Sequence, residues 1–215
     1  MSEGKVVREG KVVRESKVVR ESKGESPKRR RNPEQTRKAI IQGLLSAVHD
    51  GEFDPTTRSI AERAGVSERS IFVHFPTRTA LITASVDLQS DQVEALIAEA
   101  DPELPLEQRI EAVVRQSEAI FALQREPRVL GLIESLRTPE VDARMRLTDT
   151  RIRDALGRMF APELARHEGD QLLDLIDATA GWPYRHHLVD RRGLSKRAAS
   201  DAVRRALTAM LVREG

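Results

Sequence analysis

The sequence predicts an all-α fold. From Pro33 to near the C-terminus, apolar residues recur every three to four positions, which is the period of an amphipathic helix. Prolines and glycines divide this pattern into segments, and no segment alternates polar and apolar residues for long enough to predict a strand. Only 3% of the residues are aromatic, so the core must consist mainly of Leu, Ile, Val and Ala.

The earliest predicted helices are short and closely spaced. The first ends before Gly51 and Pro55, and its apolar face consists of Ile40, Ile41, Leu44, Leu45 and Val48. Thr56 is the predicted N-cap of a second helix over residues 57–64. Gly65 stands where that helix must end and the chain must reverse, a position that favours a positive φ and hence glycine.

A third helix, "ERSIFVHF", follows Ser67, which can cap it. The inward residues of the second and third helices, which can share a core with Ile40, Leu44 and Val48, are Ile60, Ala61, Ala64, Val66, Ile71 and Phe75. The third helix then presents Arg69, Ser70, Val73 and His74 outward. Two packed short helices of this kind can place the second in a DNA major groove. Any all-α protein can contain such a hairpin, so the pattern alone leaves DNA binding open.

Longer helices are predicted after Pro76, separated by prolines and one glycine turn. The prolines of "DPELPLEQ" end the first of them, later prolines mark further boundaries, and "RRGLS" is a turn. The predicted ranges are 78–100, 106–124, 127–137, 139–159, 168–190 and 195–213. Pro183 lies inside the range 168–190 and should kink or interrupt that helix.

The N-terminal tail, residues 1–32, combines a short repeat with basic charge. Lys5, Lys11 and Lys17 each begin a copy of Lys-Val-Val-Arg-Glu, and a six-residue period fits neither a helix nor a heptad. Residues 1–31 contain eleven Lys and Arg against five Glu, whereas the remainder contains 25 basic against 29 acidic residues. We expect a disordered tail. Such a tail is compatible with a basic arm on DNA, formed by Lys28, Arg29, Arg30 and Arg31.

The composition disfavours several classes of protein. Cysteine is absent, which excludes disulfides and thiolate metal sites. No apolar run approaches the roughly 18 to 20 residues that cross a bilayer, and no signal peptide is recognisable, so we expect a cytoplasmic protein without a membrane partner. His186 and His187 point to different sides of a helix and make a poor metal pair. Because catalytic motifs are also absent, we predict no enzyme activity, no metal and no cofactor.

Residues 56–81 closely resemble the helix-turn-helix of the tetracycline-repressor (TetR) family of bacterial transcription regulators. The stretch "IAERAGVSERSIFVHFPTRTAL" follows the family pattern I-A-x-x-A-G-V-S-x-x-T-L-Y-x-H-F-x-S-K-x-x-L. The identical positions are Ile60, Ala61, Ala64, Gly65, Val66, Ser67, His74, Phe75 and Leu81, and the positions that match by type are Ser70, Ile71, Thr77 and Arg78. The resemblance is specific over about residues 35–90. It implies a helix-turn-helix domain over 33–79 and a larger helical effector-binding and dimerisation domain over 80–215.

The resemblance also implies which side chains meet DNA. Arg78 would replace the family's usual lysine as a phosphate contact, and Arg69 suits either a bidentate contact to guanine or a phosphate contact. Phe72 replaces a usual tyrosine, and it either touches a thymine methyl group or packs; the role of Glu68 stays open. The predicted DNA-binding residues are Thr56, Thr57, Glu68, Arg69, Ser70, Phe72, Val73, His74 and Arg78, together with Lys28, Arg29, Arg30 and Arg31 of the arm.

In the family resembled, the C-terminal helices form a small-molecule cavity and a dimer interface. The predicted ligand-binding residues are Phe121, Ile133, Leu136, Met145, Ile152, Met159, Trp182, Tyr184 and His186. The alternative is that the apolar ones are core and that the polar residues of "GWPYRHH" are solvated. The final helix carries an apolar stripe that would pair with a second chain or be buried within its own; it consists of Ala199, Val203, Ala206, Leu207, Met210 and Leu211.

We therefore expect a homodimeric, TetR-like transcription regulator, and a repressor rather than an activator. It would bind double-stranded DNA at a palindromic operator, dimerise through its last two helices, and be released by an unknown small-molecule effector. An architectural DNA-binding protein without sequence preference is the first alternative, and a small helical enzyme or carrier is the second.

Overall fold

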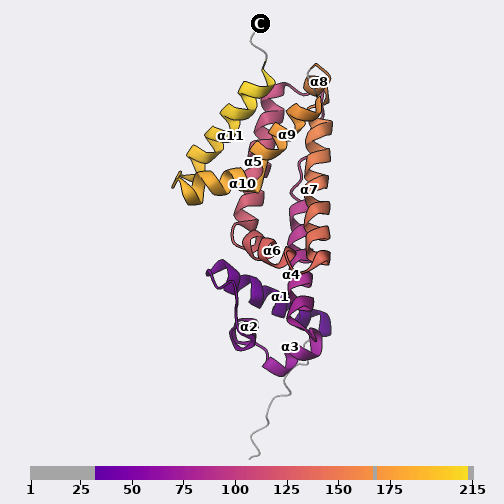
Figure 1. Cartoon of the computed structure of the whole chain (residues 1–215), viewed down its shortest axis with the longest axis vertical. Helices are drawn as coiled ribbons and strands as arrows, with labels where there is room; N and C mark the ends of the chain where they lie inside the picture. Colours follow the sequence, from indigo (N-terminus) through magenta and orange to yellow (C-terminus); the bar gives the residue numbers. More distant parts are fainter. Residues whose placement is uncertain (1–31, 167–168, 213–215) are drawn as a thin grey trace, which may run out of the picture. The chain divides into compact units, whose positions relative to one another are not determined.

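Helices make up all regular structure in residues 32–166 and 169–212, the ranges that the computed structural model describes (Figure 1). The tail with Lys28, Arg29, Arg30 and Arg31 lies outside these ranges. The elements are α1 Pro33–His49, α2 Thr57–Ala64, α3 Glu68–His74, α4 Arg78–Glu94, α5 Leu106–Gln124, α6 Pro127–Ser135, α7 Pro139–Met159, α8 Ala161–Leu164, α9 Gly169–Ala180, α10 Trp182–His186, the π-helical turn η1 His187–Arg191 and α11 Lys196–Leu211. The all-α prediction is confirmed.

Local caps define the short helices of the N-terminal part. Thr56, Ser67 and Thr77 each accept a hydrogen bond from the main-chain N–H three residues further on, at 3.1, 3.2 and 3.1 Å. Gly65 ends α2 in the left-handed region, with φ 63° and ψ 40°. The predicted caps at Thr56 and Ser67 and the predicted glycine turn are confirmed, so the local sequence sets where α2 and α3 begin and end.

The apolar faces of α1 to α4 share a core with α6 and α7. Leu130 of α6 and Val141 and Met145 of α7 are buried in the same cluster as the N-terminal helices. The N-terminal members are Ile40, Ile41, Leu44, Leu45, Val48, Ile60, Ala61, Ala64, Ile71, Phe75, Leu81, Ile82 and Val86, with Val66 partly buried against them. Because α4 takes part in this core, it connects the three preceding helices, α1, α2 and α3, with the helices that follow.

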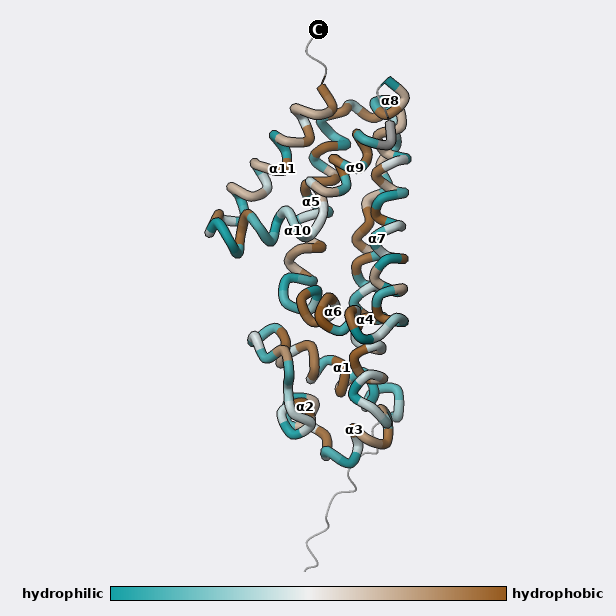
Figure 2. The backbone as a smooth tube through the Cα atoms, viewed as in Figure 1, coloured by the Kyte–Doolittle hydropathy of each residue, from teal (hydrophilic) through white to brown (hydrophobic). Residues whose placement is uncertain are grey.

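A second core lies between α5, α7, α9 and α11. Its buried residues are Ile110, Val113, Val114, Leu156, Met159, Phe160, Leu172, Ile176, Ala180, Val203, Leu207 and Leu211. Figure 2 shows apolar and polar residues alternating along α7 and α11, as amphipathic helices require. On α11, Ala199, Val203 and Leu207 are completely buried. The apolar stripe, predicted to pair with a second chain or to be buried within its own, therefore packs mainly within its own chain, with Ala206 and Met210 half-buried.

The predicted helix 168–190 is divided into three parts. Gly181 has an extended conformation, with φ −72° and ψ 163°, and caps α10, in which Pro183 occupies the first turn. The predicted interruption at Pro183 is confirmed, whereas η1 was not predicted. Arg185 is 1% exposed and donates hydrogen bonds to Ser117 Oγ at 2.7 Å and to the Val114 carbonyl at 2.9 Å. These bonds fasten α10 to α5.

Two further side chains fix the end of α4 and the start of α5. Helix α4 ends at Glu94 rather than at residue 100, and the Gln116 side chain accepts a hydrogen bond from the Ala98 main-chain N–H at 2.5 Å in the loop that follows. Arg109, near the start of α5, pairs with Glu163 of α8 through contacts of 2.6 and 2.8 Å. The Arg109 Nε also donates to the Leu104 carbonyl at 2.9 Å, so polar contacts hold both parts of the loop, near Ala98 and at Leu104, against the body.

Among the helices of the described ranges, none is both long enough and apolar enough to cross a membrane.

Candidate DNA-binding surface and ligand cavity

Helix α3 exposes the side chains that the sequence predicts at DNA. Phe72 and Val73 are 59% and 71% exposed, and Glu68 and Arg69 are exposed beside them. Ser70 and His74 are half-buried, and the Ser70 hydroxyl lies 2.8 Å from the Ser67 hydroxyl. In Figure 1, α3 lies at the end of residues 32–212 that is remote from α8. The surface of α3 therefore combines one basic, one acidic and two apolar side chains, with the hydroxyl of Ser70 at its margin.

The Thr56, Thr57 and Arg78 side chains have structural contacts of their own. Thr56 is exposed and its hydroxyl caps α2, whereas Thr57 is half-buried. The Arg78 guanidinium lies 2.7 Å from Asp54 Oδ1 and donates to the Pro55 carbonyl at 3.0 Å. Arg78 thus holds the loop before α2 against the start of α4. A phosphate contact by Arg78, as predicted, would have to share the guanidinium with this loop.

Arg37 positions the C-terminal end of α3. Its Nη1 donates to the carbonyl of His74 at 3.1 Å, and its guanidinium carbon lies 4.2 Å from the centroid of the Phe75 ring. A cation at a helix C-terminus is favourable because the last carbonyl groups carry partial negative charge. The role of Arg37 was not predicted from the sequence, because Arg37 lies on α1, 37 residues from its partner, and outside the matched motif.

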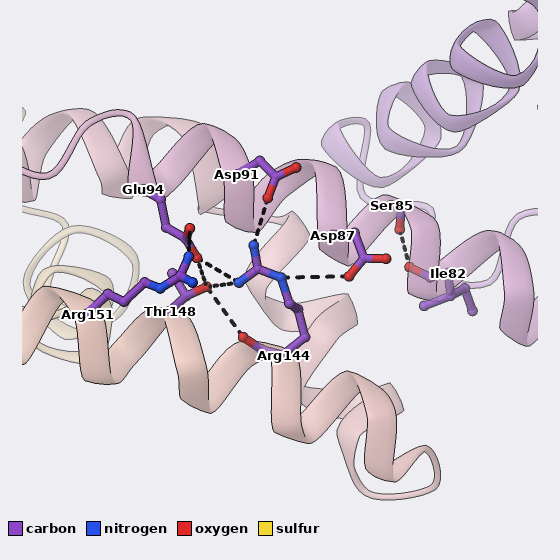
Figure 3. A network of polar contacts seen from close by, with 8 residues as sticks. All are labelled: Ile82, Ser85, Asp87, Asp91, Glu94, Arg144, Thr148 and Arg151. Carbon is purple, nitrogen blue, oxygen red and sulfur yellow. Dashed lines mark hydrogen bonds and ion pairs between the residues drawn. The ribbon is translucent and has the colours of Figure 1, made fainter. Parts of the chain in front are cut away.

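Helix α4 is tied to α7 by a charged network (Figure 3). Arg144 of α7 donates to Glu94 Oε1 at 2.7 Å and to Asp91 Oδ1 at 2.8 Å, and its Nε lies 3.7 Å from Asp87. Arg151 also pairs with Glu94. Burial raises the pKa of Glu94, but the hydrogen bonds and positive charges of its partners outweigh this effect and leave the pKa below its ordinary value. The network therefore holds the helix that follows the helix-turn-helix against the body.

A cavity of about 210 Å³ lies between α5, α6, α7, α9 and the start of α10. Ile120, Ile152 and Trp182 contribute apolar surface, and Arg128, Asp149 and Asp177 contribute charge, with six further residues: Gln116, Gln124, Ala178, Ala180, Gly181 and Pro183. The Trp182 indole N–H donates to the Gln124 carbonyl at 3.1 Å, which fixes the ring at the cavity wall. The cavity is smaller than most drug-binding pockets and suits a small organic molecule.

The predicted ligand residues divide between this cavity and other places. Ile152 and Trp182 line it, the Phe121 ring lies 6.2 Å from Trp182, and the His186 ring stacks on Trp182 at 4.5 Å. Met145 lines a separate small cavity, Met159 belongs to the second core and borders an open hollow, and Tyr184 packs on that core. Ile133 and Leu136 are 42% and 86% exposed, and neither lines the cavity, because their side of α6 faces away from the core.

A family model for the bacterial regulatory proteins of the tetR family matches residues 49–84, which run from the end of α1 into α4. The helix-turn-helix of this chain is therefore similar to that of the bacterial regulatory proteins of the tetR family.

Solved structures extend the TetR fold to most of the chain. A TetR-family transcriptional regulator from Mesorhizobium loti is 16% identical, and the match covers 84% of this chain and 96% of that chain with a TM-score of 0.65. A transcriptional regulator from Rhodococcus sp. Rha1 is 17% identical with the same coverage and TM-score. The TetR-like regulator LfrR from Mycobacterium smegmatis, in complex with proflavine, is 24% identical; the match covers 84% and 98% of the two chains with a TM-score of 0.60. No curated protein matches the chain.

The polar wall of the cavity was not predicted from the sequence. Arg128, Asp149 and Asp177 come from three different helices, and charged residues are frequent throughout the chain, at 33%. The prediction selected apolar and aromatic residues from a helix pattern, which does not distinguish a cavity wall from a solvated face. The one available signal was the spacing of Asp149 and Ile152 on α7, which places both on the same side of the helix.

Proposed function

We propose that this chain is a homodimeric transcriptional repressor of the TetR family that binds a palindromic operator and is released by a small ligand. The observation that carries the proposal is the exposure of Arg69, Phe72 and Val73 on a helix that is capped by Ser67 and fastened by Arg37. A helix held in this way can enter a major groove without ordering first, and Arg69 can donate two hydrogen bonds to guanine.

Operator binding is tested by fluorescence anisotropy with duplex DNA from upstream of the gene and a scrambled duplex of equal length, at about 150 mM salt. A specific regulator should prefer the first duplex by a factor on the order of a thousand or more. Equal, salt-sensitive binding to both duplexes would instead favour an architectural protein. A specific preference supplies the operator for the remaining experiments.

The base-reading role of Arg69 is tested by Arg69→Ala. Loss of a bidentate contact should cost about 1–3 kcal/mol and relax discrimination at one base pair. Arg146→Ala is the matched control, because Arg146 is 76% exposed on α7 and pairs only with Asp142 one turn away among its described ion pairs. Equal weakening of Arg69→Ala on all sequences would leave Arg69 as a phosphate contact and contradict base reading.

The proposed dimer uses the outward face of α11. Ala198, Ala202 and Ala209 lie on this face with Arg205, and none of the four is buried. Small side chains let two helices approach closely, and a two-fold dimer would place its α3 helices in half-sites about 34 Å apart. We expect Ala209→Glu to convert the dimer to a monomer in light-scattering measurements, whereas Ala143→Glu on exposed α7 should not. A dimer that survives Ala209→Glu unchanged would exclude this interface.

The cavity next to Trp182 is the proposed ligand site. LfrR holds proflavine, which supports an organic ligand for this related fold. Asp149 and Ile152 place α7 in the cavity wall, and the same helix is tied to α4 through Arg144. A ligand that fits one arrangement of α7 better than another can therefore shift the equilibrium between two positions of α4 and α3. The shift in free energy is at most the differential affinity of the ligand for the two states.

A further inference from the structure

The ligand cavity adjoins a second, smaller cavity. The second has a volume of about 20 Å³ and lies among α1, α4, α5, α6 and α7. Gln124 and Arg128 line both cavities, so the two share one wall. The polar groups that line the two cavities therefore indicate which chemical class of molecule can occupy them.

Asp177 places a poorly compensated carboxylate on the larger cavity. The nearest described cation is Arg153, whose Nη1 lies 4.0 Å away, beyond hydrogen-bond distance. That same nitrogen lies 2.7 Å from Asp174, which competes for it. Burial raises the pKa of Asp177, and the negative charges of Asp149 and Asp174 add to the effect, whereas Arg153 opposes it. A positive charge placed in the cavity would therefore stabilise the ionised carboxylate.

The other two charged groups on the wall neutralise one another. Arg128 Nη2 lies 2.7 and 3.0 Å from the two carboxylate oxygens of Asp149. Because the charges of Arg128 and Asp149 cancel, the net charge of the side chains that line the larger cavity is the negative charge of Asp177. The larger cavity therefore attracts cations and repels anions.

Gln89 adds an uncharged acceptor on the smaller cavity. Its side chain is 6% exposed, and its Nε2 donates to Gln92 Oε1 at 3.1 Å. Its Oε1 is buried without a hydrogen-bond partner in the described part of the chain, although a buried carbonyl oxygen normally has one. Each cavity is thus lined by a hydrogen-bond acceptor that lacks a close donor among the described residues, which favours an occupant that carries N–H groups.

The remaining wall is apolar and held in place. Ile120 and Ile152 line the larger cavity with Trp182, whose N–H is bonded to Gln124 and whose ring stacks on His186 with an angle of 9° between the planes. The volume of about 210 Å³ corresponds to about seven water molecules in the liquid. The occupant must therefore be small and must have an apolar body beside its polar head.

We propose that the larger cavity binds a small organic amine that is cationic at neutral pH. The ammonium group lies against Asp177, and the apolar body lies against Ile120, Ile152 and Trp182. The larger cavity accommodates a single aromatic ring with a short aminoalkyl chain. The role of this amine as the effector rests on the proposed function. Its binding to the cavity is measured without DNA.

The test compares three ligands of similar shape and different charge: 2-phenylethylamine, 2-phenylethanol and phenylacetate. Trp182 is the only tryptophan in the chain, so its fluorescence reports occupancy of the cavity. We expect the amine to bind at least about tenfold more tightly than the alcohol, equivalent to about 1.4 kcal/mol. Phenylacetate should bind least tightly.

Asp177→Asn should lower the affinity for the amine about tenfold and leave the affinity for the alcohol unchanged. The matched control is Asp154→Asn, which removes the same charge from an exposed position on α7 that does not line the cavity. Thermal unfolding of both variants verifies that they fold. Calorimetric titration checks that the fluorescence change reports binding.

Equal or weaker binding of the amine relative to the alcohol would overturn the proposal, and so would the absence of amine binding up to about 10 mM. A loss of amine affinity in Asp154→Asn equal to that in Asp177→Asn would also overturn it, because the effect would then come from general charge. Fluorescence anisotropy with the operator distinguishes a failure of the proposed ligand class from a failure of the proposed function. Specific DNA binding without amine binding refutes only the ligand class, whereas selective amine binding without specific DNA binding refutes only the proposed function.

Discussion

Arg37 donates from its guanidinium to the main-chain carbonyl of His74, the last residue of α3, at 3.1 Å. The same guanidinium lies over the ring of Phe75, which is 2% exposed. One side chain of α1 therefore fixes both the end of α3 and the buried aromatic residue that follows it. A substitution of Arg37 can therefore change the position of α3 without changing the side chains that α3 exposes.

Arg37→Lys should weaken specific DNA binding while retaining the positive charge. Lysine lacks the planar fork that bonds to His74 and stacks on Phe75 together, so α3 should be less rigidly placed. We expect about a tenfold loss of operator affinity and an unchanged salt dependence with scrambled DNA. Lys38→Ala, which removes an exposed charge from the next residue, should lower both affinities slightly and to the same extent. Wild-type operator affinity in Arg37→Lys would show that only the charge matters.

Arg144→Met should destabilise the chain by about 1–3 kcal/mol. The substitution removes charged hydrogen bonds to Glu94 and Asp91, and Glu94 is only 18% exposed, so its charge would depend on Arg151 and on the hydroxyl of Thr148. Urea unfolding at neutral pH measures the loss. Arg146→Met breaks an exposed pair on the same helix and should cost no more than about 1 kcal/mol. Equal losses in the two variants would show that the network of Figure 3 does not hold α4 to α7.

The parts of the fold that were predicted correctly depend on local sequence. Thr56, Gly65 and Ser67 act on neighbours within four residues, and the bounds of α2 and the start of α3 follow from them. Prolines gave the starts of α6 and α7 in the same way. Such signals are complete within a short window, because caps and turns use hydrogen bonds between adjacent residues.

The parts that were missed depend on contacts between distant residues. Arg37 meets His74 across 37 positions, and Asp177 lines a cavity with Asp149 of another helix. The apolar stripe of α11 has the same pattern whether it covers α5 or a second chain, so only the packing reveals that it is internal. Leu136 illustrates the reverse case, since its helical spacing suggested a cavity but its side chain is 86% exposed.

Glu163→Gln should lower both the stability of the chain and the steepness with which that stability falls in acid. Glu163 and Arg109 are 6% and 5% exposed; burial raises the pKa of Glu163, but the hydrogen bonds and charge of Arg109 more than compensate and lower it below the ordinary value of 4.5. A lowered pKa in the folded state contributes stability that is present above the ordinary pKa and is lost as the pH falls through the folded value.

Breaking this buried pair should cost about 3–5 kcal/mol at neutral pH. Below about pH 4.5, the free energy of unfolding of Glu163→Gln should fall less steeply with pH than that of the unmodified chain. Urea unfolding at a series of pH values measures both effects. The remaining slope should come from other carboxylates with lowered pKa values, including Glu94 and Glu111. Parallel curves for the two proteins would contradict the assigned role of Glu163.

Gly43→Ala should destabilise the helix-turn-helix although alanine is the better helix former. The exchange favours α1 by about 1 kcal/mol through helix propensity. A Cβ atom at this position would, however, lie 2.8 Å from the Ile60 carbonyl oxygen and 3.1 Å from the Ala64 Cβ, so α2 would have to move away from α1. Overpacking of this kind costs about 1–3 kcal/mol. Steric displacement of main-chain atoms should therefore outweigh the propensity gain.

Gly157→Ala is the matched control for Gly43→Ala, since a Cβ there would make an ordinary contact of 3.5 Å with Leu173. It should leave the free energy of unfolding unchanged or raise it by up to about 1 kcal/mol. Urea unfolding of both variants measures the difference, and operator affinity should fall only for Gly43→Ala, because only α2 positions the turn that leads into α3. If Gly43→Ala proves as stable as Gly157→Ala, the close approach of α1 and α2 is not what holds α3 in place.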